Sequence, residues 1–372
     1  MNSVILGAIL LSLASASASA AGPGQKVDIR TEDGVVVVRN PKAPAPRPGG
    51  PSNLILTQDL VIGRGPAGGP DLFAELRSVG VDDNENIWTL DWEDIKVRIF
   101  DKTGKLVSAF GQKGQGPREW QNPSRMVVLP ESTAAVLDVN KLTFYALDGT
   151  CLKELSTARS RMARFRFDSK GNIYADSFDF TPPKLRLGLV KYDPALNKIK
   201  TVAEVEEPLP VGGGFNAFTT LIYHHITADD RLVWLATSKY EFHVLDAEGK
   251  LLRRILKDHE PLQVTASDKK RVLEERFGNS AVRNQIVFSD AFPPVSFFIG
   301  DAEGRLYAQT YQTDDKGRLL YDVFDTEGRC ITRFALPREE MAFIVKKDKL
   351  YAIINEDEDG VPLIKRYAME WR

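Results

Sequence analysis

The four histidines are the first residues to consider as metal ligands or catalysts. They are His224, His225, His243 and His259, and no H-x-H or H-E-x-x-H spacing relates them. His224 and His225 are adjacent in the strand-like run LIYHHI. Neighbouring side chains of a strand point to opposite faces, so these two imidazoles cannot easily bind one metal ion. We therefore expect packed or hydrogen-bonded imidazoles and no metal site.

Three aspartates, Asp91, Asp138 and Asp176, recur at the end of a strand-like run. Paired carboxylates can bind Ca²⁺ or act as acid and base. Recurrence at one repeat position instead favours a structural task, the capping of turns. The chain contains no G-x-S-x-G motif for a nucleophilic serine. The sequence thus leaves any catalytic residue unknown.

A glycine-rich stretch, FGQKGQGPREWQNP from Phe110 to Pro123, has the composition of a phosphate-binding loop. Such a loop needs a helix directly after its glycines, so that backbone N–H groups of the helix meet the phosphate. Here Pro117 and Pro123 flank REWQN, a strand-like run RMVVL follows, and no GK[ST] is present. We interpret the stretch as a crossover between two sheets, with Trp120 wedged between them.

The bulk composition excludes several classes of protein. The 372 residues include 49 basic and 51 acidic side chains, a net charge of −2, and 43% of residues are hydrophobic. This balance gives no basic stripe for nucleic acid and no basic amphipathic helix for a membrane surface. Residues 1–20 have the apolar core and the Ala18-Ser19-Ala20 ending of a secretory signal peptide. We expect export to the periplasm or the cell exterior, and no transmembrane segment in the mature chain.

After the signal peptide, residues 21–52 form an expected lead-in that ends in PKAPAPRPGGPS, an extended linker rich in proline and glycine. Within this lead-in, the run GVVVVRN is β-prone, and we expect it to lie loosely on the main domain or to pair at one edge. Residues 53–372 are the expected main domain.

The main domain contains a repeat unit of four short strands joined by turns that contain Asp and Gly. The turn aspartates between the third and fourth strands are Asp101, Asp148, Asp193, Asp246 and Asp325. A four-stranded repeat of about 45 residues is typical of a β-propeller blade. Five complete units and a sixth that lacks its last strand indicate six blades. The apolar run from Leu54 to Gly63 is an orphan strand, and we predict that it completes the sixth blade and closes the ring.

The stretch NIW…LD…IFDKTGKLVSAFGQKGQGPREWQNP resembles NHL-like six-bladed β-propellers, in particular exported bacterial proteins called "6-bladed beta-propeller". Asn86, Trp88 and Asp91 lie on the family pattern, and Lys96 for Arg, Arg118 for Gly and Trp120 for Phe depart from it. The resemblance covers about residues 31–372. It implies an all-β fold of four-stranded antiparallel blades, but no single activity.

The two cysteines, Cys151 and Cys330, fall in blades two and five. These blades lie opposite each other in a ring of six, so the two Cα atoms are too far apart for a disulfide. We predict two unpaired thiols.

Because strand direction alternates within a blade, the long insertions all fall on one face of the ring. They are residues 112–123, 206–218 and 257–294, and in the last of them Ser267 is the expected cap of a short helix. We hypothesise that this insertion face binds a ligand, although the same aromatic residues would also serve to pack the insertions onto the ring. The candidate contacts are Trp92, Arg118, Trp120, Phe178, Phe180, Phe215, Tyr240 and Tyr311.

Two functions remain open from the sequence. The preferred one is a non-catalytic, monomeric binding propeller without a cofactor, which recognises a peptide, a glycan or a protein. The alternative is a lactonase-like hydrolase or lyase with Ca²⁺ or Zn²⁺ in the central channel. The innermost strands, such as RMVVL and ARFRF, contain few Asp, Glu or Asn residues, and this favours binding. A structural module of a cell-surface assembly is a third possibility.

Overall fold

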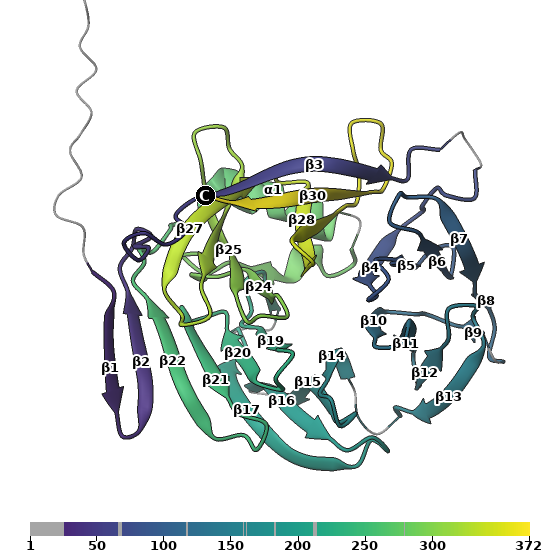
Figure 1. Cartoon of the computed structure of the whole chain (residues 1–372), viewed down its shortest axis with the longest axis horizontal. Coiled ribbons are helices and arrows are strands. Elements are labelled where there is room, and N and C mark those ends of the chain that lie inside the picture. Colours follow the sequence, from purple (N-terminus) through teal and green to yellow (C-terminus); the bar gives the residue numbers. More distant parts are fainter. Residues whose placement is uncertain are drawn as a thin grey trace, which may run out of the picture.

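The computed structural model describes residues 26–65, 69–116, 118–158, 160, 162–181, 184–210, 214–278 and 280–372. The expected signal peptide lies outside these residues. Six antiparallel sheets surround a central axis, as the repeats predict (Figure 1). The fold is therefore an all-β propeller with six four-stranded blades.

In each blade the strands follow one another from the axis outward. Blades one to three contain β4 (Leu76–Val81), β5 (Ile87–Asp91), β6 (Lys96–Phe100) and β7 (Leu106–Phe110); β10 (Arg125–Leu129), β11 (Thr133–Leu137), β12 (Lys141–Tyr145) and β13 (Cys151–Ser156); and β14 (Met162–Phe167), β15 (Ile173–Thr181), β16 (Lys184–Tyr192) and β17 (Lys198–Pro208). Blades four to six contain β19 (Ile222–Ile226), β20 (Leu232–Ala236), β21 (Glu241–Leu245) and β22 (Leu251–Lys257); β24 (Phe297–Gly300), β25 (Leu306–Thr313), β26 (Leu319–Phe324) and β27 (Cys330–Leu336); and β28 (Glu340–Lys346), β29 (Lys349–Ile354), β30 (Leu363–Trp371) and β3 (Leu54–Ile62).

The recurring aspartates fold the hairpins of each blade. Asp101 Oδ1 accepts hydrogen bonds from the backbone N–H groups of Thr103 and Lys105, at 2.8 and 3.1 Å. Asp193 and Asp325 repeat this pattern with the residues two and four positions further on. A carboxylate that accepts nearby backbone N–H groups in this way stabilises a tight turn. The repeat seen in the sequence is thus a repeat of turn chemistry.

The ring closes with a strand from the beginning of the chain. β3 pairs antiparallel with β30, and the register runs from Leu54 opposite Trp371 to Ile62 opposite Ile364. Figure 1 shows this purple strand beside the yellow C-terminal strand. Closure leaves the sixth sheet without a missing strand, so the prediction made from the orphan run is confirmed.

The lead-in is attached to the outside of blade four. β1 (Asp28–Glu32) and β2 (Val35–Asn40) form a hairpin, and β2 pairs in parallel with β22 (Figure 1). Val37 and Val38 are buried in this contact. Asn40 adds two contacts to blade five: its side chain donates to the carbonyl of Gly328 at 2.8 Å and accepts from the N–H of Cys330 at 2.7 Å. Of the two expected arrangements, edge pairing is the one observed.

Two of the three insertions pack on each other. Helix α1 (Ala266–Phe277) and the short helix η1 (Arg283–Gln285) belong to the last insertion, and its strand β23 (Ile286–Val287) pairs in parallel with β18 (Phe215–Asn216) of the insertion before it. The cap of α1 is Thr265, which forms a reciprocal capping box with Asp268. The prediction that Ser267 caps this helix was wrong, because the helix begins at Ala266 and its cap lies two residues before Ser267.

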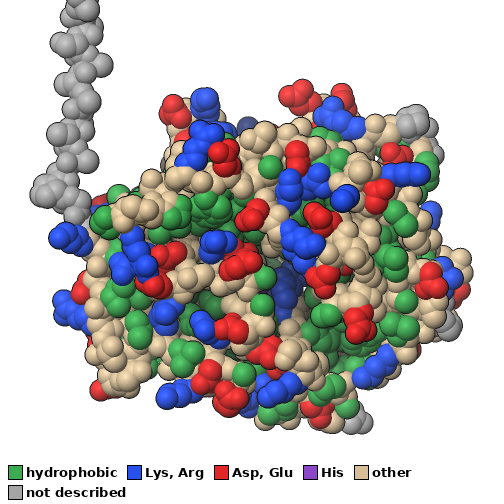
Figure 2. All heavy atoms as spheres, in the orientation of Figure 1, with side chains coloured by type: hydrophobic (Ala, Val, Ile, Leu, Met, Phe, Trp, Pro, Cys, Tyr) green, Lys and Arg blue, Asp and Glu red, His purple; other side chains and the backbone are tan. Residues whose placement is uncertain are grey.

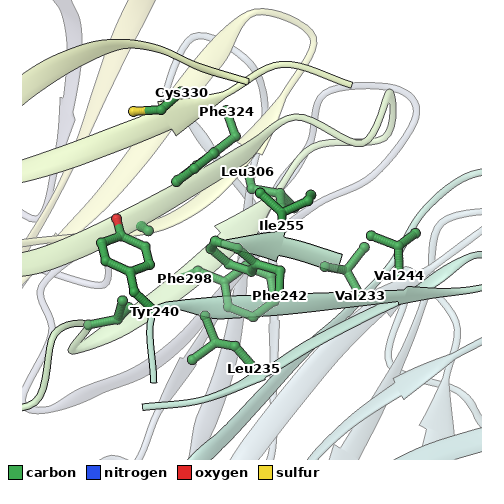
Figure 3. Close-up of a cluster of buried hydrophobic side chains, with 12 residues drawn as sticks. Val233, Leu235, Tyr240, Phe242, Val244, Ile255, Phe298, Leu306, Phe324 and Cys330 are labelled. Carbon is green, nitrogen blue, oxygen red and sulfur yellow. The ribbon is translucent and has the colours of Figure 1, made fainter. Parts of the chain in front are cut away.

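The hydrophobic core is divided into clusters, and most of them lie between neighbouring blades. Figure 3 shows the cluster between blades four and five, in which Phe242, Phe298 and Phe324 meet edge to face. The ring centroid of Phe242 lies 5.1 Å from that of Phe298 and 5.2 Å from that of Phe324. Full burial of one such ring contributes about 1.5–3 kcal/mol.

Cys330 lies in this cluster and Cys151 is partly buried in blade two; both are free thiols, as predicted. Within the described ranges, no helix has the length and apolar character needed to cross a membrane.

Candidate anion site in the central channel

The glycine-rich loop is filled by its own carboxylate. Its short strands β8 (Gln112–Lys113) and β9 (Glu119–Trp120) pair in parallel. Glu119 Oε2 accepts from the backbone N–H groups of Gln115 and Gly116, at 3.0 and 2.8 Å. These N–H groups lower the pKa of Glu119, Gly116 foremost. Because the loop N–H groups already face an anion, the crossover interpretation is supported and a phosphate site is not.

Trp120 anchors this loop between blades one and two. Its ring is completely buried, and its centroid lies 5.4 Å from that of Tyr145 and 6.0 Å from that of Phe110. The predicted wedge is therefore observed. A Cβ at Gly111 would lie 2.1 Å from the Trp120 ring, so this position requires glycine.

Two of the three recurring aspartates, Asp91 and Asp138, cap backbone at the ends of second strands, as predicted. Asp176 instead lies within β15 and forms an ion pair with Arg164. Asp91 accepts from the N–H groups of Ala74 and Glu75, at 2.9 and 3.1 Å. Asp138 likewise accepts from the N–H groups of Gln121 and Asn122. In both cases the capped segment leads into the innermost strand of the same blade.

The eight candidate residues of the insertion face do not converge on one site. Trp92 lies beneath Arg77, with the guanidinium carbon 4.8 Å from the ring centroid, and Arg118 is exposed beside Phe110. Phe178 is partly buried among residues of blades three and four. Whether any of these residues contacts a ligand stays a prediction.

Two pairs among the candidates do lie close together. Phe180 and Phe215 are both exposed, with ring centroids 6.3 Å apart. Tyr240 and Tyr311 line a cavity of about 240 Å³ between blades four and five, beside the lead-in. Tyr311 also packs against Phe218 and Phe292, so it helps to hold the insertions on the ring.

A larger cavity lies at the axis of the ring. Its volume is about 720 Å³, and residues from the innermost strands of all six blades line it. Its lining also includes the turns after these strands, for example at Glu131, Ser169 and Asp230. The cavity therefore opens on the face that carries these turns. Figure 2 shows the corresponding hollow in the middle of the ring, with basic side chains inside it.

Three arginines from two neighbouring innermost strands are gathered at this channel. Arg125 begins β10, and Arg164 and Arg166 alternate along β14, so that both point to the same side of that strand. Arg125 and Arg166 line the cavity itself. The guanidinium carbon of Arg125 lies 5.2 Å from the ring centroid of Phe343, which belongs to blade six.

Only one of the three arginines has a carboxylate partner among the described residues. Arg164 forms an ion pair with Asp176, with 2.6 Å between Nη2 and Oδ2, and its guanidinium lies over the ring of Tyr223 at 4.3 Å. Within the described ranges, Arg166 donates only to the carbonyl of its neighbour Phe165, at 2.9 Å. For Arg125, no hydrogen bond or ion pair of the side chain is found in the described chain, and its Nε is buried. The group therefore carries two positive charges without counterions.

The pKa values of the arginines reflect this lack of counterions. Burial, followed by repulsion from Arg166 and Arg164, lowers the pKa of Arg125 to about 9. Burial and repulsion from Arg164 lower the pKa of Arg166 to about 10. Both groups stay protonated at neutral pH. The channel therefore keeps its positive charge, although removing these guanidinium groups from water costs free energy.

The adjacent histidines point apart, as expected from their strand. The Nε2 of His224 lies 3.0 Å from the carbonyl oxygen of Tyr174 in blade three, and that of His225 lies 3.0 Å from the carbonyl oxygen of Asp301 in blade five. Burial, together with the positive field of Arg166, lowers the pKa of both, to about 4 for His225. Both are neutral at neutral pH. The Nδ1 of His224 is buried without a partner in the described structure.

The described residues contain no group of three or more His, Cys, Asp or Glu side chains with the geometry to hold a metal ion. The channel is instead suited to an anion, since guanidinium groups bind carboxylate and phosphate in a bidentate manner. Sequence reasoning did not identify these arginines. The available signal was the spacing R-x-R in a predicted innermost strand, with a further arginine at the start of the innermost strand one blade earlier.

The comparisons with known proteins agree with the fold. A family described as "6-bladed beta-propeller" matches residues 72–253, which span most of blades one to four. No curated protein matches the chain. This match supports the six-bladed fold and does not single out NHL repeats.

Several solved structures resemble the chain. One is a "Putative exported protein" from Bacteroides fragilis, with 14% identity and a TM-score of 0.56, covering 90% of this chain and 99% of that one. Another is a member of the DUF4221 family from Bacteroides vulgatus, with 10% identity and a TM-score of 0.52, covering 86% and 99%. A gluconolactonase from Xanthomonas campestris has 12% identity and a TM-score of 0.47, covering 81% and 88%. At such identities the likeness to the two Bacteroides proteins shows the fold alone.

Proposed function

We propose that this protein is an exported binding propeller that holds the anionic group of its ligand in the central channel, between Arg125 and Arg166. The observation that carries the proposal is the pair of partly buried arginines, without carboxylate partners in the described chain, that line a cavity of about 720 Å³. A cavity of this size is in the range of sites that bind small molecules.

Without an anion in the channel, the two arginines lower the stability of the folded protein. A buried charge without a partner destabilises the fold by several kcal/mol, and a neighbouring like charge adds to that cost. An anion between the guanidinium groups would form charge-assisted hydrogen bonds and remove the repulsion. Its binding free energy would therefore include relief of a cost already present in the free protein.

A second candidate function is recognition of a peptide, glycan or protein partner on the insertion face. The exposed pair of Phe180 and Phe215 favours it, since exposed aromatic residues contribute strongly to interfaces. A lactonase-like enzyme has less support, because the axis presents arginines where a metal centre would need carboxylates and amides.

Calorimetric titration at pH 7.5 and low ionic strength tests the channel proposal. The probes are inorganic phosphate, sulfate and acetate, and the proteins are the wild type, the double variant Arg125→Met/Arg166→Met, and Arg186→Gln as control. Arg186 is an exposed arginine of blade three that pairs with Glu206, outside the channel. We expect saturable binding of at least one anion to the wild type and the control, and at least tenfold weaker binding to the double variant. Equal binding to all three proteins, or no saturable binding, would contradict the proposal.

A further inference from the structure

We infer that the ligand is an amphipathic acid, a molecule with a carboxylate or phosphate head and an apolar body of several carbons. This inference rests on the proposed function and adds the chemical class of the ligand. It follows from how the channel distributes polar and apolar groups around the arginines.

Most of the cavity wall away from the arginines is apolar. Val79, Val128, Phe167, Ile299, Phe343 and Ile344 line it from five different blades. Val128, Ile299, Phe343 and Ile344 are only partly buried in the folded protein. Apolar side chains that face a cavity and are incompletely packed gain free energy when a ligand covers them.

The polar groups of the wall leave few other places for a charged or hydrogen-bonding ligand. The Nε2 atoms of His224 and His225 are already used by backbone carbonyls. Near the mouth, Lys153 donates to the carbonyl of Pro194 and Lys346 pairs with Asp83. The carboxylates of the lining, Glu131, Asp168 and Asp230, belong to the turns after the innermost strands and so lie near the mouth. Inside the channel, recognition of an anion is therefore concentrated at Arg125 and Arg166.

The size of the cavity separates an amphipathic acid from a bare anion. A single carboxylate or phosphate contacting the arginines would leave most of a space of about 720 Å³, and its apolar wall, in contact with water. An alkyl or aromatic body would cover that wall and exclude the water, which also strengthens the ion pairs at the head. Each buried methylene should tighten binding by roughly threefold to fourfold.

The test compares ligands that differ only in body or only in head. Octanoate and octyl phosphate carry both parts, acetate and inorganic phosphate carry the head alone, and octylammonium carries the same body with the opposite charge. All are titrated calorimetrically into the wild-type protein below their micelle concentrations. We expect octanoate to bind at least 100-fold more tightly than acetate, and octylammonium not to bind.

The outcomes separate this inference from the proposed function. If acetate or phosphate binds within threefold of its octyl counterpart, the amphipathic class is wrong and the anion site stands. If octylammonium binds as tightly as octanoate, or no anion binds, both are wrong. Ile344→Thr gives a second, milder test, because threonine suits a strand but shortens the apolar wall. It should weaken octanoate about tenfold and leave phosphate unchanged, whereas Val107→Thr, at an exposed position of β7, should change neither.

Discussion

This propeller has two groups of charged side chains in its interior. In one group every charge has a partner, and in the other positive charge is in excess. The first, which we call the latch, consists of Lys257, Asp322, Arg333 and the hydroxyl of Tyr240, and it lies between blades four and five. Lys257 donates to the carbonyls of Pro41 and Lys42 in the lead-in, at 2.8 and 2.6 Å.

Asp322 balances the latch. It forms an ion pair with Arg333 and accepts from Tyr240 Oη at 2.6 Å, and Lys257 lies 4.0 Å away. Arg333 also donates to the carbonyl of Lys42, at 3.0 Å. Every charge of the latch therefore has a partner, and the group fixes the lead-in to the ring.

The second group, the channel arginines, has an excess of positive charge. Arg125 and Arg166 lack a carboxylate partner in the described part of the chain, and the one acidic neighbour, Asp176, is taken by Arg164. The difference suggests how to distinguish a structural from a functional group of charges. A buried network that is complete within the protein stabilises the fold, and one that would be complete only with an added anion fits the ligand site proposed above.

The largest effect should come from breaking the latch. Asp322→Asn keeps the size of the side chain but removes the charge that faces Arg333 and Lys257. We expect a loss of about 3–5 kcal/mol in the free energy of unfolding, because the buried Lys257 and the partly buried Arg333 lose their counterion. Urea denaturation measures it. Asp28→Asn removes a partner from an exposed ion pair with Arg30 and should cost less than about 1 kcal/mol. Similar losses in both variants would mean that the latch is not a complete network.

The next effect concerns the protonation of His225, which the channel disfavours. Burial and the field of Arg166 lower the pKa of His225 to about 4 in the folded protein, against the usual 6.5. Between these values the unfolded chain binds a proton that the folded chain does not, so stability falls as the pH is lowered from 6.5 to 4. The shift corresponds to a loss of the order of 3 kcal/mol from this residue.

Denaturation at pH 4, 5, 6 and 7 measures this dependence, with His225→Gln as the comparison. Glutamine can still donate to the carbonyl of Asp301 but does not titrate, so the slope between pH 4 and 6.5 should decrease in the variant. Parallel curves for the two proteins would show that His225 is not held neutral by the channel.

The fold could be predicted from the sequence, but the difference between the two groups of charges could not. The blade count and the closing strand follow from a repeat of Asp and Gly turns, because turn chemistry is local. The role of an arginine, by contrast, depends on partners that the fold brings from other parts of the chain. Arg98 and Arg125 both belong to short apolar strands, yet Arg98 pairs with Asp91 at 3.1 Å and Arg125 has no such partner in the described structure.

The latch could not be predicted from the sequence either. Its charged members lie on β22, β26 and β27, and they hold a lead-in more than 200 residues away along the chain. The position of the Glu119 carboxylate in the glycine-rich loop could not be predicted either, although its partners are close to it in the sequence. Only the folded backbone reveals that its carboxylate faces the loop N–H groups.

A smaller effect of opposite sign is expected in the channel. Arg125→Met replaces a partly buried charge, unpaired in the described chain, with an apolar side chain of similar length. It should stabilise the protein in the absence of an anion by about 1–2 kcal/mol. Arg98→Met is the matched control, because Arg98 is also buried but is paired with Asp91, and its loss should destabilise the fold by about 3–5 kcal/mol. Urea denaturation of both variants in a buffer without multivalent anions gives the signs. Destabilisation by Arg125→Met would place Arg125 with the structural charges.

The smallest effect separates the two candidate binding surfaces. Phe180 is 52% exposed at the end of the β15–β16 hairpin, and its neighbour Phe215 is 42% exposed. Phe180→Ser should therefore change the free energy of unfolding by less than about 0.5 kcal/mol and leave octanoate binding in the channel unchanged. A loss above 1 kcal/mol would mean that the pair belongs to the core, and a weaker affinity for octanoate would mean that the insertion face and the channel act as one site. With neither change, the two phenylalanines remain a free surface, available to a partner that binds independently of the acid in the channel.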